Sequence, residues 1–133
     1  MIDYESQIYT KVETALTAAF PNVTVASVED YNPSALPFVS VVEIDNQAYA
    51  LSRDTDSNEN HAVLVYEINV MSDKRGGRKS NCKAITAVVD SAMQRMGFTR
   101  LMSNPVSLDD ATKYRMVLRY TAIISKNGVI YRR

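Results

Sequence analysis

The stretch HAVLVYEINVMSDKRGGRKSNCKAITAVVDSAMQRMG, residues 61–97, decides the fold of the chain. Apolar side chains recur at every second position over residues 62–70, which is the period of a β-strand. Val63 and Val65 add apolar side chains to the second face, which indicates a strand in the interior of its sheet. A polar, basic turn over residues 72–79 follows this strand.

After the turn, the apolar period changes to that of an amphipathic helix, which we expect to end at Gly97 in a left-handed conformation. One side of this helix is predicted to pack on the sheet and comprises Ile85, Val88, Val89, Ala92 and Met96. The other side is predicted to point outward and comprises Lys83, Thr86, Asp90 and Gln94. A strand followed by such a helix predicts a helix layered on a sheet.

The flanking sequence predicts one more helix and several strands. Asp3 is expected to cap a first helix that runs to about Ala19 and is ended by Phe20-Pro21. Strands are expected at residues 23–28, 36–44, 98–106 and 114–124, and Asn127-Gly128 favours a tight turn into a short terminal hairpin. In the strand at 36–44, the residues predicted to face inward are Leu36, Phe38, Val42 and Ile44.

These elements predict one α+β domain over residues 1–133, in the order α-β-β-β-α-β-β. Short connections favour a single antiparallel, or mixed, sheet of four to five strands with two helices packed on one face. The strands at 36–44 and 61–71 are expected to form the arms of one hairpin across a long polar interval.

Charge and cysteine content limit the classes of function. The chain has 15 Lys and Arg against 15 Asp and Glu, so no global attraction to nucleic acid or to an anionic membrane is expected. The single Cys82 cannot form an internal disulfide, which favours a reducing compartment. No apolar run approaches the length of a membrane span, and the N-terminus lacks the pattern of a signal peptide.

The motifs that carry chemistry are incomplete. Asp54-x-Asp56-x-Asn58 opens like an EF-hand loop, but Glu59 stands where glycine is needed and Val65 where a bidentate glutamate is needed. A solvated acidic loop is therefore favoured over a calcium site. His61 and Cys82 cannot supply a structural zinc site, and we expect Cys82 to be a buried structural thiol. No cofactor and no enzymatic activity are predicted.

Two groups of charged residues are candidates for contacts with partners. Lys74, Arg75, Arg78 and Lys79 form a basic turn before a helix, without the spacing of a nucleotide-binding loop. A solvated turn is favoured there over a site for an anion or DNA phosphate. In an oligomer, Arg115 and Arg119 would form a rim able to meet acidic loop residues. The predicted inter-subunit or partner contacts are Arg53, Asp54, Asp56, Glu59, Arg115 and Arg119.

Three segments resemble the tail terminator, or tail completion, proteins of long-tailed bacteriophages and prophages. They are VLVYEINVMSDK at 63–74, AVVDSAMQRMGFTRL at 87–101 and DATKYRMVLRYTAIISKNGVIYRR at 110–133. The N-terminal helix with its aromatic-proline stop is also similar, so that the resemblance covers nearly the full chain. The motifs are structural rather than catalytic, and several phage head–tail joining proteins share comparable folds.

The resemblance implies a virion tail protein, assembled in the host cytoplasm as a hexameric ring on top of the tail tube. The ring would end tube polymerisation and form the joint to the head connector or stopper. Its partners would be copies of itself, the tail tube protein and the connector, with non-specific contact with DNA in the channel. A ring needs a heterologous interface, and the loop at 47–60 is hypothesised to reach a neighbour or line the lumen.

Alternative roles in the same particle are a head–tail stopper or adaptor and a tail tube subunit. A DNA-contacting module using the basic turn is a second class, and a small enzyme is a third.

Overall fold

The computed structural model describes residues 1–30, 32–49 and 60–131. The elements in chain order are α1 (Glu5–Ala19), β1 (Thr24–Ala26), β2 (Phe38–Ala48), β3 (His61–Ser72), α2 (Arg78–Met96), β4 (Thr99–Val106), β5 (Tyr114–Ser125) and β6 (Ile130–Tyr131). The predicted α+β class and the order α-β-β-β-α-β-β are therefore confirmed, and the short β6 is the second arm of the terminal hairpin.

The sheet has six strands, in the order β1-β2-β3-β5-β4, with β6 paired to β5. The pairing of β1 with β2 is parallel and the other pairings are antiparallel, so the sheet is mixed. Two of the strands, β1 and β6, are only three and two residues long, which explains why the sheet exceeds the predicted four to five. All twelve residues of β3 pair with β5, and β2 lies on its other side, so its interior position is confirmed.

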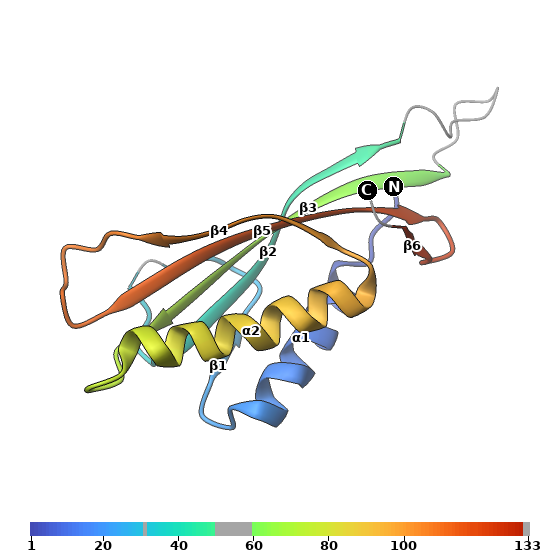
Figure 1. Ribbon diagram of the computed structural model, residues 1–133. Coiled ribbons are helices and arrows are strands. Elements are labelled where there is room, and N and C mark those ends of the chain that lie inside the picture. The colour runs from blue at the N-terminus through green and yellow to red at the C-terminus, as the bar shows by residue number, and fades with distance from the viewer. Residues whose placement is uncertain (31, 50–59, 132–133) are drawn as a thin grey trace.

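Both helices lie on one face of the sheet, as predicted (Figure 1). The helix α2 packs on β3 and β5 and against α1, and the core fills the space between the helices and the sheet. Tyr66 on β3 and Phe98 before β4 are fully buried there, with their ring centroids 5.5 Å apart in an edge-to-face contact. Each fully buried large apolar side chain stabilises the fold by about 1.5–3 kcal/mol. The core includes Val12, Leu16, Leu64, Ile68, Ile85, Val89, Met93, Leu118 and Ile124.

The capping residues of the two helices agree with the prediction, except that the N-cap of α1 is Tyr4 and not Asp3. Tyr4 is the N-cap of α1, and the Asp3 carboxylate accepts a hydrogen bond of 3.2 Å from the backbone N–H of Glu5. Asp3 thus acts one residue earlier than a standard cap. Gly97 ends α2 with a φ of 106°, the left-handed conformation predicted for it. The backbone N–H of Phe98 then donates to the carbonyl of Met93, which directs the Phe98 ring into the core.

The inward face predicted for β2 is wrong. Val39 and Val41 pack in the core between helices and sheet, opposite Val70 and Ile68 of β3. The predicted inward set was Leu36, Phe38, Val42 and Ile44. Of these, Phe38 is buried on the far face of the sheet, and Ile44 is 43% exposed where a bulge interrupts the register. Both faces of this strand carry apolar residues, so the alternation of the sequence does not determine which face turns inward.

The side of α2 predicted to point outward is also partly wrong. Thr86 is buried, with its hydroxyl 3.7 Å from the sulfur of Met116 on β5. Asp90 is half-buried, and its carboxylate accepts a hydrogen bond of 2.7 Å from the Tyr120 hydroxyl. The helix lies flat on a broad sheet, so its contact surface extends beyond the apolar stripe.

Candidate assembly surfaces

The acidic loop was predicted to contact a partner. Arg53, Asp54, Asp56 and Glu59 lie outside the described residues. Their pairing with Arg115 or Arg119 of a neighbouring copy stays a prediction. The described part of the structure does show what those two arginines contact within their own chain.

Arg115 lies on the far face of the sheet and is bound within its own chain. Its guanidinium donates to the Asn69 carbonyl oxygen over 2.6 and 3.0 Å and to the Glu29 carboxylate over 3.0 Å. Only 12% of the Arg115 side chain is exposed. A charge-assisted hydrogen bond to a carboxylate is one of the stronger polar interactions in a protein. Arg115 therefore anchors the connection between β1 and β2 to β3 and β5.

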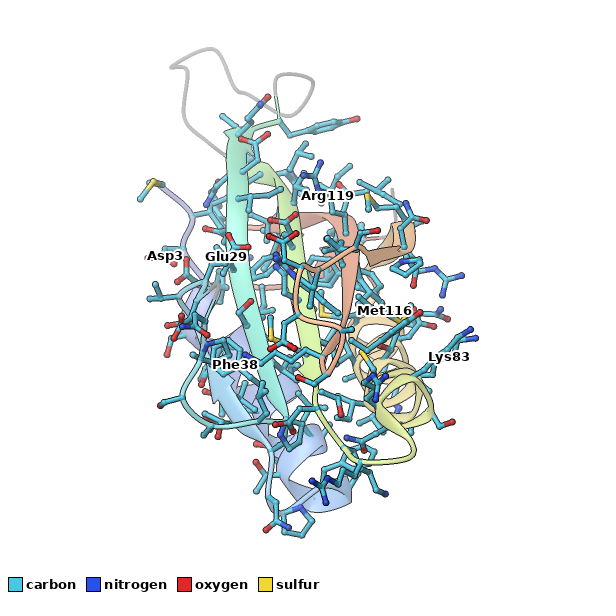
Figure 2. The ribbon with its side chains drawn as sticks, turned by 90° about the vertical axis from the view of Figure 1, so that its left-hand side faces the viewer. Asp3, Glu29, Phe38, Lys83, Met116 and Arg119 are labelled. Atoms are coloured by element: carbon cyan, nitrogen blue, oxygen red, sulfur yellow. The ribbon has the colours of Figure 1, made fainter. Side chains whose placement is uncertain are left out.

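Arg119 agrees better than Arg115 with the predicted exposed rim. Its side chain is 47% exposed, and its guanidinium donates to the Glu67 carboxylate at 3.3 Å. An exposed pair of this kind contributes about 0–1 kcal/mol. Arg119 (Figure 2) is thus accessible to a partner, although its charge already has an intramolecular counterpart.

The predicted basic turn is exposed at the start of α2. We use the term basic patch for Lys74, Arg75, Arg78, Lys79 and Lys83, all of which are exposed. None of the five has a carboxylate within ion-pair distance among the described residues. Lys83 was predicted to point outward but was not assigned to the basic group; its signal was the four-residue spacing from Lys79, which puts both on one helical face. The five cations are available to a negatively charged partner.

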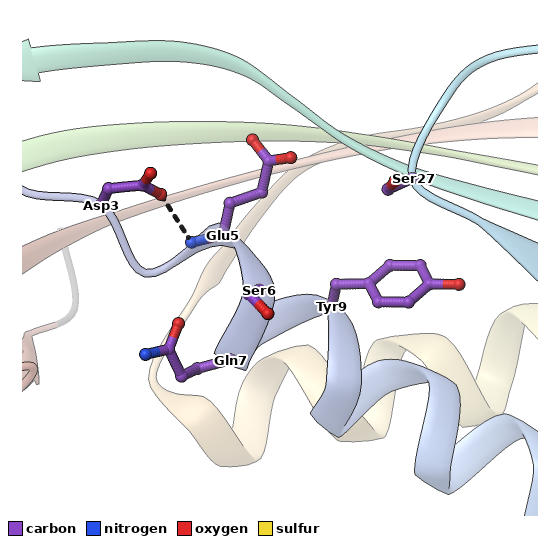
Figure 3. Close-up of a pocket in the computed structure, with 6 residues that line it drawn as sticks. All are labelled: Asp3, Glu5, Ser6, Gln7, Tyr9 and Ser27. Carbon is purple, nitrogen blue, oxygen red and sulfur yellow. Dashed lines mark hydrogen bonds between the residues drawn. The ribbon is translucent and has the colours of Figure 1, made fainter.

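A group of acidic residues that the sequence analysis did not single out surrounds the start of α1. A hollow of about 360 Å³ there is lined by Asp3, Glu5, Ser6, Gln7, Tyr9 and Ser27 (Figure 3). Glu43 on β2 lies beside it, and its carboxylate accepts a hydrogen bond of 3.2 Å from the Tyr66 hydroxyl. We use the term acidic patch for Asp3, Glu5 and Glu43. Acidic side chains are common in the first turn of a helix because they interact favourably with the positive end of the helix dipole. The sequence alone therefore gave no reason to assign them a binding role.

The charge of Glu43 is poorly compensated. Burial raises the pKa of Glu43 above its ordinary value, and the nearby charges of Glu5 and Asp3 raise it further. Hydrogen bonds from Tyr66 and Asn46 oppose this shift of the pKa without cancelling it. Within the described part of the chain, no Lys or Arg lies within ion-pair distance of the acidic patch.

The far face of the sheet carries an apolar hollow near the end of β5. It measures about 220 Å³ and is lined by Tyr49, His61, Ile123 and Tyr131. The rings of His61 and Tyr131 lie 5.7 Å apart. This places His61 among aromatic and aliphatic side chains.

Cys82 is a buried thiol, as predicted. It is fully buried on α2, and its sulfur lies 3.3 Å from the carbonyl oxygen of Val70, to which it donates. Burial raises the pKa of the thiol to about 11. His61 begins β3 and Val70 lies toward its other end, so the fold separates the cysteine from the histidine. Across residues 1–30, 32–49 and 60–131, no three His, Cys, Asp or Glu side chains are grouped to hold a metal ion.

Neither helix in the described part of the chain has the length and apolar character required to cross a membrane.

Comparison with known proteins gives a likeness in fold. No protein-family model matches the chain, and no curated protein sequence matches it. One similar solved structure is a chain from the virion of a native gene transfer agent particle, with a TM-score of 0.65 and 21% identity. The match covers 89% of this chain and 91% of that one. A second solved structure, whose name states no function, has a TM-score of 0.57 and 14% identity over 87% and 89% of the two chains. At these identities the fold is shared over nearly its whole length.

Proposed function

We propose that the protein is a structural subunit of a phage-like virion, and that within it the chain forms the ring that caps the tail tube. The observation that supports the first part is the fold shared with a virion chain of a gene transfer agent over nine-tenths of each protein. The finer assignment to a tail terminator is supported by the three sequence segments at 63–74, 87–101 and 110–133.

The surfaces described above support assembly with copies of the same chain. A head-to-tail ring requires two unlike surfaces on each subunit, because each interface joins one surface to the other. The chain carries an acidic patch and a basic patch with a formal net charge of zero. In this role the protein needs no cofactor and catalyses no reaction. Its partners are copies of itself, the tail tube protein and the head connector, and it resides in the virion tail.

The test is to add the purified protein to tail tube protein while the tubes polymerise. A terminator shortens the tubes and appears at one end of each in negative-stain images. A tube subunit is incorporated along the length, and a stopper or adaptor leaves tube length unchanged. Tubes that keep their length and carry no bound protein would refute the capping role.

A further inference from the structure

We infer that the acidic patch of one copy receives the basic patch of the next copy, so that subunits join head to tail through these two charged surfaces. This inference rests on the proposed assembly of the chain into a ring. It assigns the interface to residues other than the acidic loop and the rim arginines that the sequence indicates.

The two patches lie on opposite flanks of the molecule. Asp3 lies at the flank formed by β2 and the start of α1, whereas Lys83 lies on α2 at the opposite flank (Figure 2). Surfaces on opposite flanks cannot meet within one subunit. In adjacent copies related by a rotation they meet at every interface, which is the geometry of a heterologous contact.

The acidic patch offers a site that fits a long cationic side chain. Its hollow of about 360 Å³ is lined by the Asp3 and Glu5 side chains and by the Tyr9 ring (Figure 3). Two carboxylates provide acceptors for a guanidinium or ammonium group, and an aromatic ring provides a face that attracts a cation. The Tyr9 hydroxyl lies 2.9 Å from both Glu13 Oε2 and Val25 O, which fixes the position of the ring.

The edge of the sheet beside the acidic patch is open to a neighbour. The strand β1 pairs only with Phe38–Ser40, so beyond Ser40 the outer edge of β2 has no partner among the described strands. Glu43 lies on this unpaired part of β2. A neighbouring copy can therefore approach the acidic patch without displacing a strand of the sheet.

The basic patch is the complementary surface because its five cations are grouped at the start of α2, whereas three arginines elsewhere are paired within their own chain. Arg115, Arg119 and Arg100 have ion-pair partners in Glu29, Glu67 and Asp90 of their own chain. The five cations of the basic patch have no such partner among the residues described. A chain that carries an acidic patch and a basic patch on opposite flanks is complementary to a second copy of itself.

The experiment uses charge reversal and mixing of full-length chains. One variant carries Asp3→Lys and Glu5→Lys, and the other carries Arg78→Glu and Lys79→Glu. The mass in solution is measured at low and high salt by sedimentation over a range of concentrations. We expect wild type to associate at low salt, and each variant alone to associate at least tenfold more weakly. Each variant alone carries two patches of like charge, which repel in a head-to-tail contact. An equimolar mixture should regain assembly, because the two variants then present patches of opposite charge to each other.

In the mixture, interfaces form between the two unchanged patches and between the two reversed patches. A control variant with Arg95→Glu and Lys126→Glu makes the same change in net charge as Arg78→Glu with Lys79→Glu, outside both patches, and should assemble like wild type. Circular dichroism verifies that every variant keeps the wild-type fold. A milder variant, Asp3→Asn with Glu5→Gln, gives an intermediate loss of association if Asp3→Lys with Glu5→Lys does not fold.

Three results would overturn the inference. They are a wild-type chain that stays monomeric at low salt, variants that assemble as wild type does, and a mixture that fails to regain assembly. Loss of DNA binding in the Arg78→Glu, Lys79→Glu variant with self-association unchanged would assign the basic patch to nucleic acid instead. If the chain is monomeric but still caps tail tubes, the inference fails and the proposed function stands. If the chain forms charge-dependent rings that do not affect tail tubes, the inference stands and the capping role fails.

Discussion

Arg115 on β5 and Glu29 in the connection between β1 and β2 form an ion pair of 3.0 Å across 86 residues of sequence. Replacing Arg115 with methionine would remove the hydrogen bonds that its guanidinium donates to the Glu29 carboxylate and to the side-chain carbonyl oxygen of Asn69. We expect a loss of about 2–3 kcal/mol in the free energy of unfolding, because three charge-assisted hydrogen bonds of a mostly buried guanidinium are lost. Urea denaturation measures this change.

The matched control is Arg119→Met, which removes the exposed pair with Glu67 on the same strand and face. Its cost should stay below about 1 kcal/mol. Equal losses for the two variants would show that Arg115 does not anchor the connection.

Gly97→Ala should destabilise the protein more than Gly76→Ala. Both glycines have a positive φ, 106° and 71°, so either alanine pays about 1 kcal/mol or more for the left-handed conformation. A Cβ at Gly97 would also lie 3.1 Å from Cγ2 of Ile130, whereas a Cβ at Gly76 meets no atom within 4 Å. Thermal unfolding of the two variants isolates the contact with Ile130. A larger loss at Gly76 would contradict this assignment.

Phe98→Ala should be among the more damaging single substitutions in the described core. The ring is fully buried and packs edge-to-face on Tyr66, so its removal leaves a cavity and should cost about 3–5 kcal/mol. Leu101→Ala, at a side chain that is 57% exposed, should change the free energy of unfolding by less than about 0.5 kcal/mol. Chemical denaturation compares the two variants. A loss below about 1 kcal/mol for Phe98→Ala would contradict the observed packing of the ring.

Glu43→Gln should change how stability depends on pH. The pKa of Glu43 is raised by burial in the folded chain, so the fold favours the protonated carboxyl and loses stability as pH rises through that pKa. Glutamine is uncharged at every pH and still offers Tyr66 an acceptor. The variant should therefore equal or exceed wild type in stability at pH 7, with a smaller loss between pH 4 and pH 7.

Urea titrations at several pH values, at concentrations where the chain is monomeric, measure the difference. The two proteins should converge below pH 4, where the wild-type carboxyl is also protonated. A variant that is less stable than wild type only at neutral pH would mean that the Glu43 charge is favourable in the monomer.

Cys82 should react slowly with thiol reagents in the folded protein. A pKa of about 11, against an ordinary 9.0, lowers the thiolate fraction at neutral pH about 100-fold, and full burial slows the reaction further. The rate should rise to that of a free cysteine in denaturant. A fast reaction in native buffer at pH 7 would show that α2 separates readily from β3.

The strands and helices could be predicted as elements, and the inward face of a strand could be predicted where its apolar and polar residues alternate clearly. In β5, the residues from Tyr114 to Ile124 alternate clearly, and Gly97 and Asn127-Gly128 mark their turns by backbone chemistry. The strand β2 offered apolar residues on both faces. Its orientation depends on which residues of β3 it meets, Val70 and Ile68 opposite Val39 and Val41, and that register is a tertiary property.

The candidate surfaces were predictable to a smaller extent. The basic turn is contiguous in sequence, so its exposure followed from composition. The acidic patch joins Asp3 and Glu5 to Glu43, which only the packing of α1 beside β2 brings near one another. Arg115 alternates with buried residues like any outward strand residue, and nothing in the sequence identifies Glu29 as its partner.

The full-length pairing of β3 with β5 also has a consequence for newly synthesised chains. Their twelve-residue ladder joins strands that are separated in sequence by α2 and β4. The β2–β3 hairpin is synthesised well before its neighbour β5, and until β5 arrives one long edge of β3 has open hydrogen-bonding groups. In newly made chains, aggregation through this open edge therefore competes with pairing of β5. A chaperone that binds during translation would act at this stage.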